Sequence, residues 1–99
     1  MTHPRLPELP PPGCWFLYII LCSDKALYTG ITTDVERRFS EHASGRGARF
    51  FRGRQPLRVV YRETHLDRAA ASRREYQIKQ LTRQQKLALL EESASALPV

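Results

Sequence analysis

The chain has no asparagine, only two cysteines and no apolar run long enough to cross a bilayer. Its longest apolar run, residues 14 to 22, has the length of a single strand. Residues 1 to 13 lack the charged region, apolar core and small-residue cleavage site of a secretory signal. These absences argue against a membrane-spanning or secreted protein, and we expect a cytoplasmic one.

Cys14 and Cys22 bracket the apolar run. If this run is an extended strand, the two cysteines lie too far apart along it to form a disulfide. We therefore expect two buried, reduced thiols. No pair of cysteines or histidines has the spacing of a zinc site, so the sequence gives no sign of a Cys/His metal domain.

Charge of one sign dominates the middle of the chain. The sequence has 16 basic and 10 acidic residues, for a net charge of +6, and 13 of the basic residues are arginines. Eight arginines and one acid, Glu41, fall between Arg37 and Arg62. Arginine binds phosphate through a planar fork and stacks on bases, so this clustering favours nucleic acid over a merely solvated surface. The candidate phosphate-binding residues are Arg37, Arg46, Arg49, Arg52 and Arg54.

Ninety-nine residues make one small domain. Residues 1 to 13 hold five of the seven prolines, and we interpret them as a flexible leader. We place the folded domain at residues 14–92 and expect residues 93–99 to form a frayed tail. Phe50, Phe51 and Tyr61 are interleaved with the arginines and offer stacking surfaces for bases.

Hydrophobic patterns and turn signals predict an α+β fold with a small three-stranded antiparallel sheet flanked by helices. The expected order is strand, strand, helix, strand, helix, helix. Capping-box spacings starting at Thr33 and at Thr82, and an N-cap at Asp67, mark the helix starts. The third strand alternates so that Val59 and Tyr61 share one side. The predicted strands cover residues 15–22, 27–31 and 57–62, and residues 44–56 form a surface loop facing phosphate.

The first helix carries Val35, Arg38, Phe39 and His42 at the spacing of a single face. We expect Val35 and Phe39 to be buried there, with Arg38 and His42 at the edge. On the second helix, Glu75 shares a face with small and apolar residues, which is an unusual place for a carboxylate. Phenols, a guanidinium, an imidazole and a carboxylate together suit work on a phosphodiester. The candidate site residues are Tyr18, Tyr28, Arg38, His42 and Glu75, with Gly30 allowing close backbone approach.

Phe16-Leu17-Tyr18 and Tyr28-Thr29-Gly30, followed by Arg38, His42 and Glu75, resemble the GIY-YIG nuclease domain. The resemblance covers roughly residues 15 to 90 and is closest to the small stand-alone bacterial members, the YhbQ-like proteins. It also includes the segments 27–34 and 81–87 and the Gly-Arg-Gly-Ala-Arg run. Phe16 stands where the first motif has Gly, Thr29 where the second has Ile, and the chain lacks the Asn that several larger members use.

The resemblance implies a metal-dependent phosphodiester hydrolase. We expect an endonuclease acting on DNA, on structured or damaged DNA in repair or recombination, because a single basic loop on a small domain offers phosphate contacts but little surface for reading bases. The resemblance also implies that Glu75 is the single protein ligand of Mg²⁺ or Mn²⁺ and that Arg38 stabilises charge on the scissile phosphate. Tyr18 would act as general base or orient water, with Tyr28 and His42 hydrogen-bonding around it. As a base, Tyr18 needs a lowered pKa; otherwise metal-bound water is the nucleophile's source, or His42 relays the proton.

Each residue alone also has an ordinary structural explanation. Tyr18 can be a core aromatic, Arg38 a solvated edge residue and His42 a partner of the helix dipole. Glu75 can pair with Arg74 or with Lys79. Two other functions stay open on the sequence: a non-catalytic module that binds DNA or RNA, and a partner subunit that uses the proline-rich leader or the last helix.

Overall fold

The computed structural model of the chain describes residues 13–95. Three strands and three helices follow one another in the expected order, with one short 3₁₀ turn between the first helix and the third strand. The elements are β1 (Trp15–Cys22), β2 (Leu27–Thr32), α1 (Val35–Ala43), η1 (Arg49–Phe51), β3 (Pro56–His65), α2 (Arg68–Lys79) and α3 (Arg83–Ser95).

β1 is the central strand of an antiparallel sheet with the order β2-β1-β3. Its residues form a continuous hydrophobic run. Such a run is typical of a strand whose two faces are both covered by other parts of the protein. Tyr18 in its middle lies opposite Gly30 of β2 and Arg62 of β3. The predicted α+β fold with a three-stranded antiparallel sheet is therefore confirmed.

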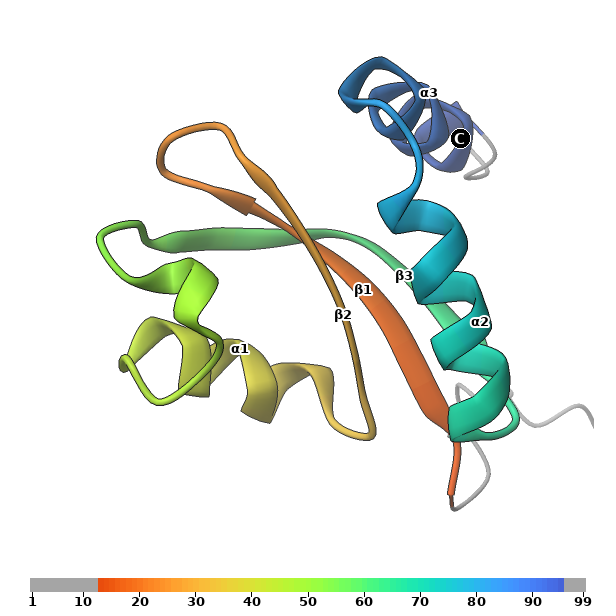
Figure 1. The fold of residues 1–99 in the computed structure, drawn as a ribbon, viewed down its shortest axis with the longest axis horizontal. Helices are drawn as coiled ribbons and strands as arrows, with labels where there is room; N and C mark the ends of the chain where they lie inside the picture. The colour runs from red at the N-terminus through yellow and green to blue at the C-terminus, as the bar shows by residue number, and fades with distance from the viewer. Residues whose placement is uncertain (1–12, 96–99) are drawn as a thin grey trace, which may run out of the picture.

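The helices form layers on the two faces of this sheet (Figure 1). On one face, Tyr18, Ile20 and Cys22 pack with Val35 of α1 and Phe51 of η1. On the other face, Leu17 and Ile19 pack against Ile78 of α2, with leucines of α3 at the margin. Because side chains alternate along a strand, β1 supplies the core of both layers.

A β-bulge in β3 overturns the expectation that Val59 and Tyr61 share one side. Ile19 pairs with Tyr61 and Ile20 pairs with Val59, so Val60 is an extra residue in the ladder. Val59 consequently packs on the α1 face, whereas Tyr61 packs on the α2 face. A strict two-residue alternation cannot anticipate such an insertion.

The helix starts agree with the sequence except for one cap. Asp67 accepts a hydrogen bond from the Ala70 amide at 2.8 Å, as expected for the N-cap of α2. Thr82 and Gln85 bond each other's backbone amides in the reciprocal pattern of a capping box. For α1, however, the N-cap is Asp34 and not Thr33, because the Asp34 carboxylate accepts from the Arg37 amide at 3.0 Å.

The ends of the described region differ little from expectation. Both cysteines are buried, free thiols, as predicted. α3 continues to Ser95, so helical structure extends into the segment expected to be a tail. The rest of that tail and residues 1–12 of the leader lie outside the described residues. No helix within residues 13–95 has the length and hydrophobicity needed to span a bilayer.

Replacing Ile78 with Ala should destabilise the domain by about 2–5 kcal/mol, because it opens a cavity where α2 packs on the sheet. Urea unfolding followed by circular dichroism measures this change. Leu66→Ala is the matched control, since Leu66 is 84% exposed and its loss should cost less than about 0.5 kcal/mol. Equal unfolding midpoints for the two variants would contradict the packing of α2.

Candidate functional site

The Tyr18 hydroxyl and the His42 imidazole meet inside the α1 face of the sheet. The phenol oxygen lies 2.9 Å from Nε2 of His42. Tyr18 is 1% exposed and His42 is 2% exposed, so this hydrogen bond is fully buried. The expectation that His42 lies at the edge of its helix is therefore wrong. A buried hydroxyl on the central strand needs a polar partner, and α1 supplies one.

The backbone after α1 fixes which nitrogen of His42 carries the proton. The Ala48 amide lies 3.2 Å from Nδ1, and an amide can only donate. Neutral His42 therefore has its proton on Nε2 and donates it to the Tyr18 oxygen. The Tyr18 hydroxyl keeps its own proton available for another acceptor. In this arrangement His42 orients Tyr18 and does not receive its proton.

Two glycines make this contact sterically allowed. A Cβ on Gly30 would lie 2.6 Å from the Tyr18 hydroxyl oxygen, which is closer than real Cβ contacts come. A Cβ on Gly47 would overlap Nδ1 of His42 and lie 2.8 Å from its Cα. Gly30 was predicted from the need for close approach. Gly47 has the equivalent role on the histidine side, and it was not singled out in the sequence analysis.

An aromatic cluster encloses the Tyr18–His42 pair. The Tyr28 ring centroid is 5.2 Å from that of His42 and 4.8 Å from that of Phe51. Phe51 is 7% exposed and stacks 4.3 Å from His42. The segment 44–56 is thus not only a surface loop, because η1 delivers Phe51 into the core. The predicted stacking surface at Phe51 is wrong, while Phe50 stays partly exposed beneath Arg54.

Burial controls the protonation of both polar partners. It raises the pKa of Tyr18 further above its ordinary value; Tyr28 adds to the shift, and the positive charge of Arg38 opposes it. It lowers the pKa of His42 to about 4, with a further lowering from Arg38. At neutral pH the protein alone therefore holds a neutral phenol and a neutral imidazole. This favours Tyr18 as an orienting donor over Tyr18 as a phenolate base.

Arg38 lies on the same helix as His42, half-buried beside the tyrosines. Its Nη1 atom is 3.1 Å from Glu41 on the next turn, and both side chains are about one-third exposed. A pair this exposed is weak, so the guanidinium can exchange Glu41 for a phosphate. The site therefore offers one cation beside the Tyr18 phenol.

Glu75 lies on α2, the helix that covers the opposite face of the sheet from Tyr18. Its carboxylate is 3.2 Å from Lys79, one turn further along. Arg74 instead pairs with Glu63 of β3 at 3.0 Å. Within residues 13–95, Glu75 makes no hydrogen bond to Tyr18 or Tyr28. The Glu75 carboxylate and the two phenol groups lie on opposite faces of the sheet. The edge strand β2 is where these two faces adjoin.

The donor set at Glu75 fits a hydrated hard cation. Within residues 13–95, no three His, Cys, Asp or Glu side chains gather to hold a metal ion. Mg²⁺ keeps several waters and often takes one or two protein carboxylates together with substrate phosphate oxygens. One half-buried Glu suits that chemistry, whereas it does not suit a four-ligand zinc site.

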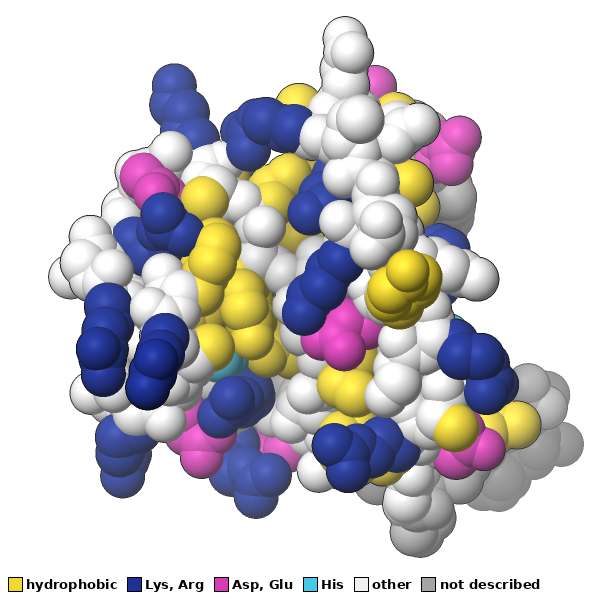
Figure 2. Space-filling view, in the orientation of Figure 1, with side chains coloured by type: hydrophobic (Ala, Val, Ile, Leu, Met, Phe, Trp, Pro, Cys, Tyr) yellow, Lys and Arg dark blue, Asp and Glu magenta, His cyan; other side chains and the backbone are white. Residues whose placement is uncertain are grey.

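The candidate DNA-contacting arginines lie mostly in solvent. Lys and Arg side chains gather over α1 and the segment that contains η1 (Figure 2). Arg54 differs from the others because it pairs with Asp24 at 3.0 Å and lies over the Phe50 ring at 4.1 Å. It is partly engaged in holding the hairpin to η1. The exposed members of the predicted set are Arg37, Arg46, Arg49 and Arg52.

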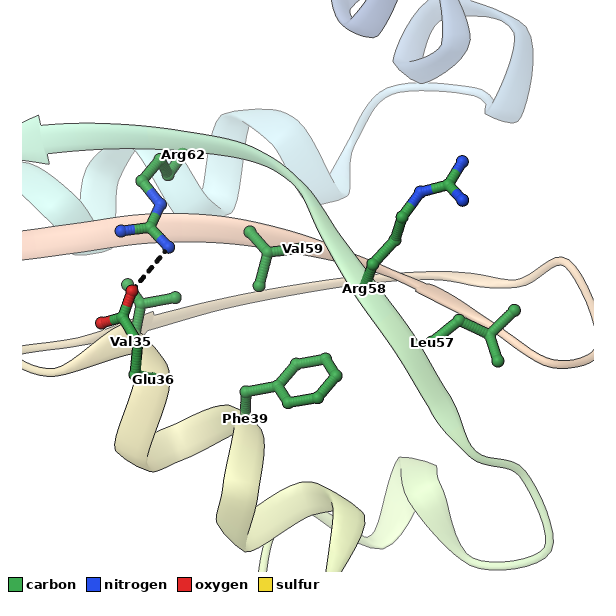
Figure 3. A pocket seen from close by; sticks show the side chains of 7 residues that line it. All are labelled: Val35, Glu36, Phe39, Leu57, Arg58, Val59 and Arg62. Carbon is green, nitrogen blue, oxygen red and sulfur yellow. Dashed lines mark hydrogen bonds and ion pairs between the residues drawn. The ribbon is translucent and has the colours of Figure 1, made fainter.

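A groove of about 430 Å³ lies between α1 and β3 (Figure 3). Phe39 and Val59 line its apolar wall, and Glu36 bridges its mouth to Arg62 at 3.0 Å. Neither tyrosine of the candidate site lines this groove. His42 and Arg38 do not line it either, so the groove is separate from the predicted constellation.

The match between fold and site defines the class of protein. The description "GIY-YIG catalytic domain" fits residues 14–88, which is most of the chain. The chain belongs to the GIY-YIG family. Within this family match, Tyr18, Tyr28 and His42 lie in contact with one another beside Gly30.

The relatives narrow the assignment to small bacterial proteins. A UPF0213 protein of Desulfotalea psychrophila is 52% identical over 88 residues, covering 88% of this chain and 79% of the relative. The UPF0213 protein YhbQ of Escherichia coli is 52% identical over 80 residues, covering 81% and 80%. These names state no activity.

Two solution NMR structures have the same fold. A UPF0213 protein of Bacillus halodurans is 44% identical, with a TM-score of 0.52, and the match covers 79% of this chain and 83% of that one. The E. faecalis protein EF2693 is 34% identical, with a TM-score of 0.60, and the match covers 87% and 92%. The resemblance to the YhbQ-like group is therefore confirmed.

Lowering the pH should selectively weaken the fold through His42. Because folding lowers the pKa of His42 from 6.5 to about 4, the unfolded chain binds more protons between these values. Its contribution, up to about 3 kcal/mol, is complete above pH 6.5 and is lost as the pH falls towards 4. Urea unfolding at pH 7.5 and 4.5 measures the loss.

His42→Gln is the control for this effect, because it cannot titrate while every other group stays the same. The variant should lose less stability than wild type over the same pH interval. NMR of the imidazole should give a midpoint near 4 in the folded wild type. A midpoint near 6.5 would contradict the buried, neutral state of His42.

Proposed function

We propose that this protein is a metal-dependent endonuclease that hydrolyses phosphodiester bonds of DNA. The observation that supports it most is the convergence of Tyr18, Tyr28, Arg38 and His42 beside the edge strand, in a chain of the GIY-YIG family. A nuclease-type family and a strongly basic surface together point to nucleic acid as substrate.

The roles follow from the protonation states. Arg38 binds the scissile phosphate and stabilises the charge that grows on its oxygens. Tyr18 accepts a hydrogen bond from His42 and donates its own proton to the phosphate or to the attacking water. Tyr28, half-buried against His42, forms the solvent side of this arrangement.

Glu75 would hold a single Mg²⁺ or Mn²⁺. Such an ion supplies Lewis-acid stabilisation and lowers the pKa of bound water. Because Lys79 already neutralises Glu75, the carboxylate does not repel DNA before the cation binds. With such an ion held by Glu75, activation of water would not need a Tyr18 phenolate, which the protein alone does not produce.

The surface suits structured or damaged DNA more than a long recognition sequence. The exposed arginines offer phosphate contacts, and phosphate contacts position a protein without reading bases. Within residues 13–95, Arg46, Arg49 and Arg52 lie in the segment between α1 and β3 and not along a helix that could read bases in the major groove. We therefore propose cleavage at branches, nicks or ends during repair or recombination.

Glu75→Gln should abolish cleavage while leaving DNA binding intact or slightly tighter, because it removes the cation's ligand and a negative charge. Labelled single-stranded, duplex, flapped and four-way DNA, together with RNA, are incubated with Mg²⁺, with Mn²⁺ or with EDTA. Glu91→Gln, an exposed carboxylate on α3, is the matched control and should cleave like wild type.

Each other outcome of this assay favours a different function. Salt-sensitive binding by wild type without any product would favour a non-catalytic nucleic-acid module. Neither binding nor product would favour a partner subunit. Cleavage of RNA alone would move the substrate class from DNA to RNA.

Arg38→Ala should reduce turnover by about 10²–10³-fold with little loss of affinity, because it removes one charge-stabilising donor from the transition state. Replacing Arg46, Arg49 and Arg52 with Ala should do the opposite. It should weaken binding and lower the salt dependence, since each lost phosphate contact reduces counterion release. Single-turnover cleavage at saturating enzyme separates the two effects. Indistinguishable profiles would contradict the division into catalytic and docking arginines.

A further inference from the structure

A second cavity adjoins the candidate site and shares Tyr28 with it. Its volume is about 230 Å³, and it opens where β2, η1, α2 and α3 come together. Over β2 and towards α3, Figure 2 shows hydrophobic surface bordered by Lys and Arg side chains. The cavity is lined by Leu27, Tyr28, Thr29, Phe50, Lys79 and Lys86.

The Thr29 hydroxyl is the strongest sign that this cavity takes a ligand. Thr29 is 3% exposed, and its Oγ1 atom has no hydrogen-bond partner among the described residues. A buried hydroxyl without a partner is unfavourable and needs an explanation. A ligand with oxygen acceptors in the cavity would supply the missing partner. The apolar Ile usual at this position in the family motif has no such requirement.

Two lysines give the cavity its charge. Lys79 comes from α2 and Lys86 from α3, and no acidic side chain lines the space between them. The partner of Lys79 is Glu75, through a half-exposed pair of the kind that contributes little. Two ammonium groups and a hydroxyl are donors suited to a phosphate. The rings of Tyr28 and Phe50 add a surface for a sugar or base.

We propose that this cavity is a phosphate subsite for the DNA strand being cut. It holds a phosphate neighbouring the scissile one, with Lys79 and Lys86 as donors, and the adjoining nucleotide packs on Phe50. The inference rests on the proposed function for its substrate, and it assigns roles to two lysines and to Thr29. Because Tyr28 belongs to the candidate site and also lines this cavity, the two sites hold neighbouring phosphates of one DNA strand.

Lysine footprinting tests the subsite directly, because the chain has only three lysines. The full chain is acetylated with and without DNA in EDTA, where no cleavage occurs, and the products are measured by mass spectrometry. Lys79 and Lys86 should be protected by DNA. Lys25, in the exposed turn between β1 and β2, should react equally in both samples.

Binding by variants gives a second measurement. Lys79→Gln combined with Lys86→Gln should lower the slope of log affinity against log salt by about 1.4–1.8, for two lost phosphate contacts. Lys25→Gln should leave the slope unchanged. Thr29→Val, which keeps the shape of the side chain, should weaken binding without changing the slope. Melting curves establish that each variant is folded.

The outcomes separate this inference from the nuclease proposal. If wild type cleaves DNA but neither lysine is protected, or if the double variant binds like Lys25→Gln, the subsite is overturned and the nuclease stands. If both lysines are protected and the slope falls but wild type yields no product, the subsite stands and the nuclease proposal fails.

Discussion

The buried hydrogen bond between Tyr18 and His42 is the constraint on which the rest of the site depends. The Tyr18 hydroxyl is buried on the central strand of a small sheet, and without a polar partner it would cost about 1–3 kcal/mol. The imidazole that satisfies it comes from α1, so this bond fixes α1 against the sheet. Its second nitrogen needs the Ala48 amide, and the two close approaches need Gly30 and Gly47.

The sheet separates the candidate site residues into an α1 layer and an α2 layer. The two layers adjoin at the edge strand β2. Side chains alternate along this edge strand, so Tyr28 faces the α1 layer while Thr29 faces α2. Glu75 belongs to the α2 layer, and the phenols belong to the other. β2 is an edge strand, so no further strand of the sheet lies between Glu75 and the phenol groups along that edge.

The sequence predicted what depends on local chemistry. The hairpin, the Asp67 cap and the Thr82 capping box involve residues within a few positions of one another, and all were found. The close approach at Gly30 was also predictable, since only Gly fits beside a large strand residue. These features are set by spacing alone.

The misses all depend on tertiary packing between elements and not on spacing within one element. The bulge at Val60 depends on how β3 aligns with β1. The burial of His42 depends on η1, which turns Phe51 inward across the imidazole. The lysine pair at the second cavity joins two helices through tertiary packing. In a binary pattern, Phe51 and His42 look the same whether they face solvent or core.

The ion pair of Glu75 with Lys79 is a local contact across one helical turn. It was predicted as the ordinary alternative to metal binding, yet the two are compatible. If Glu75 gives its oxygens to a cation, Lys79 loses its partner and is free to bind phosphate, so one helical turn can serve both the cation and the substrate.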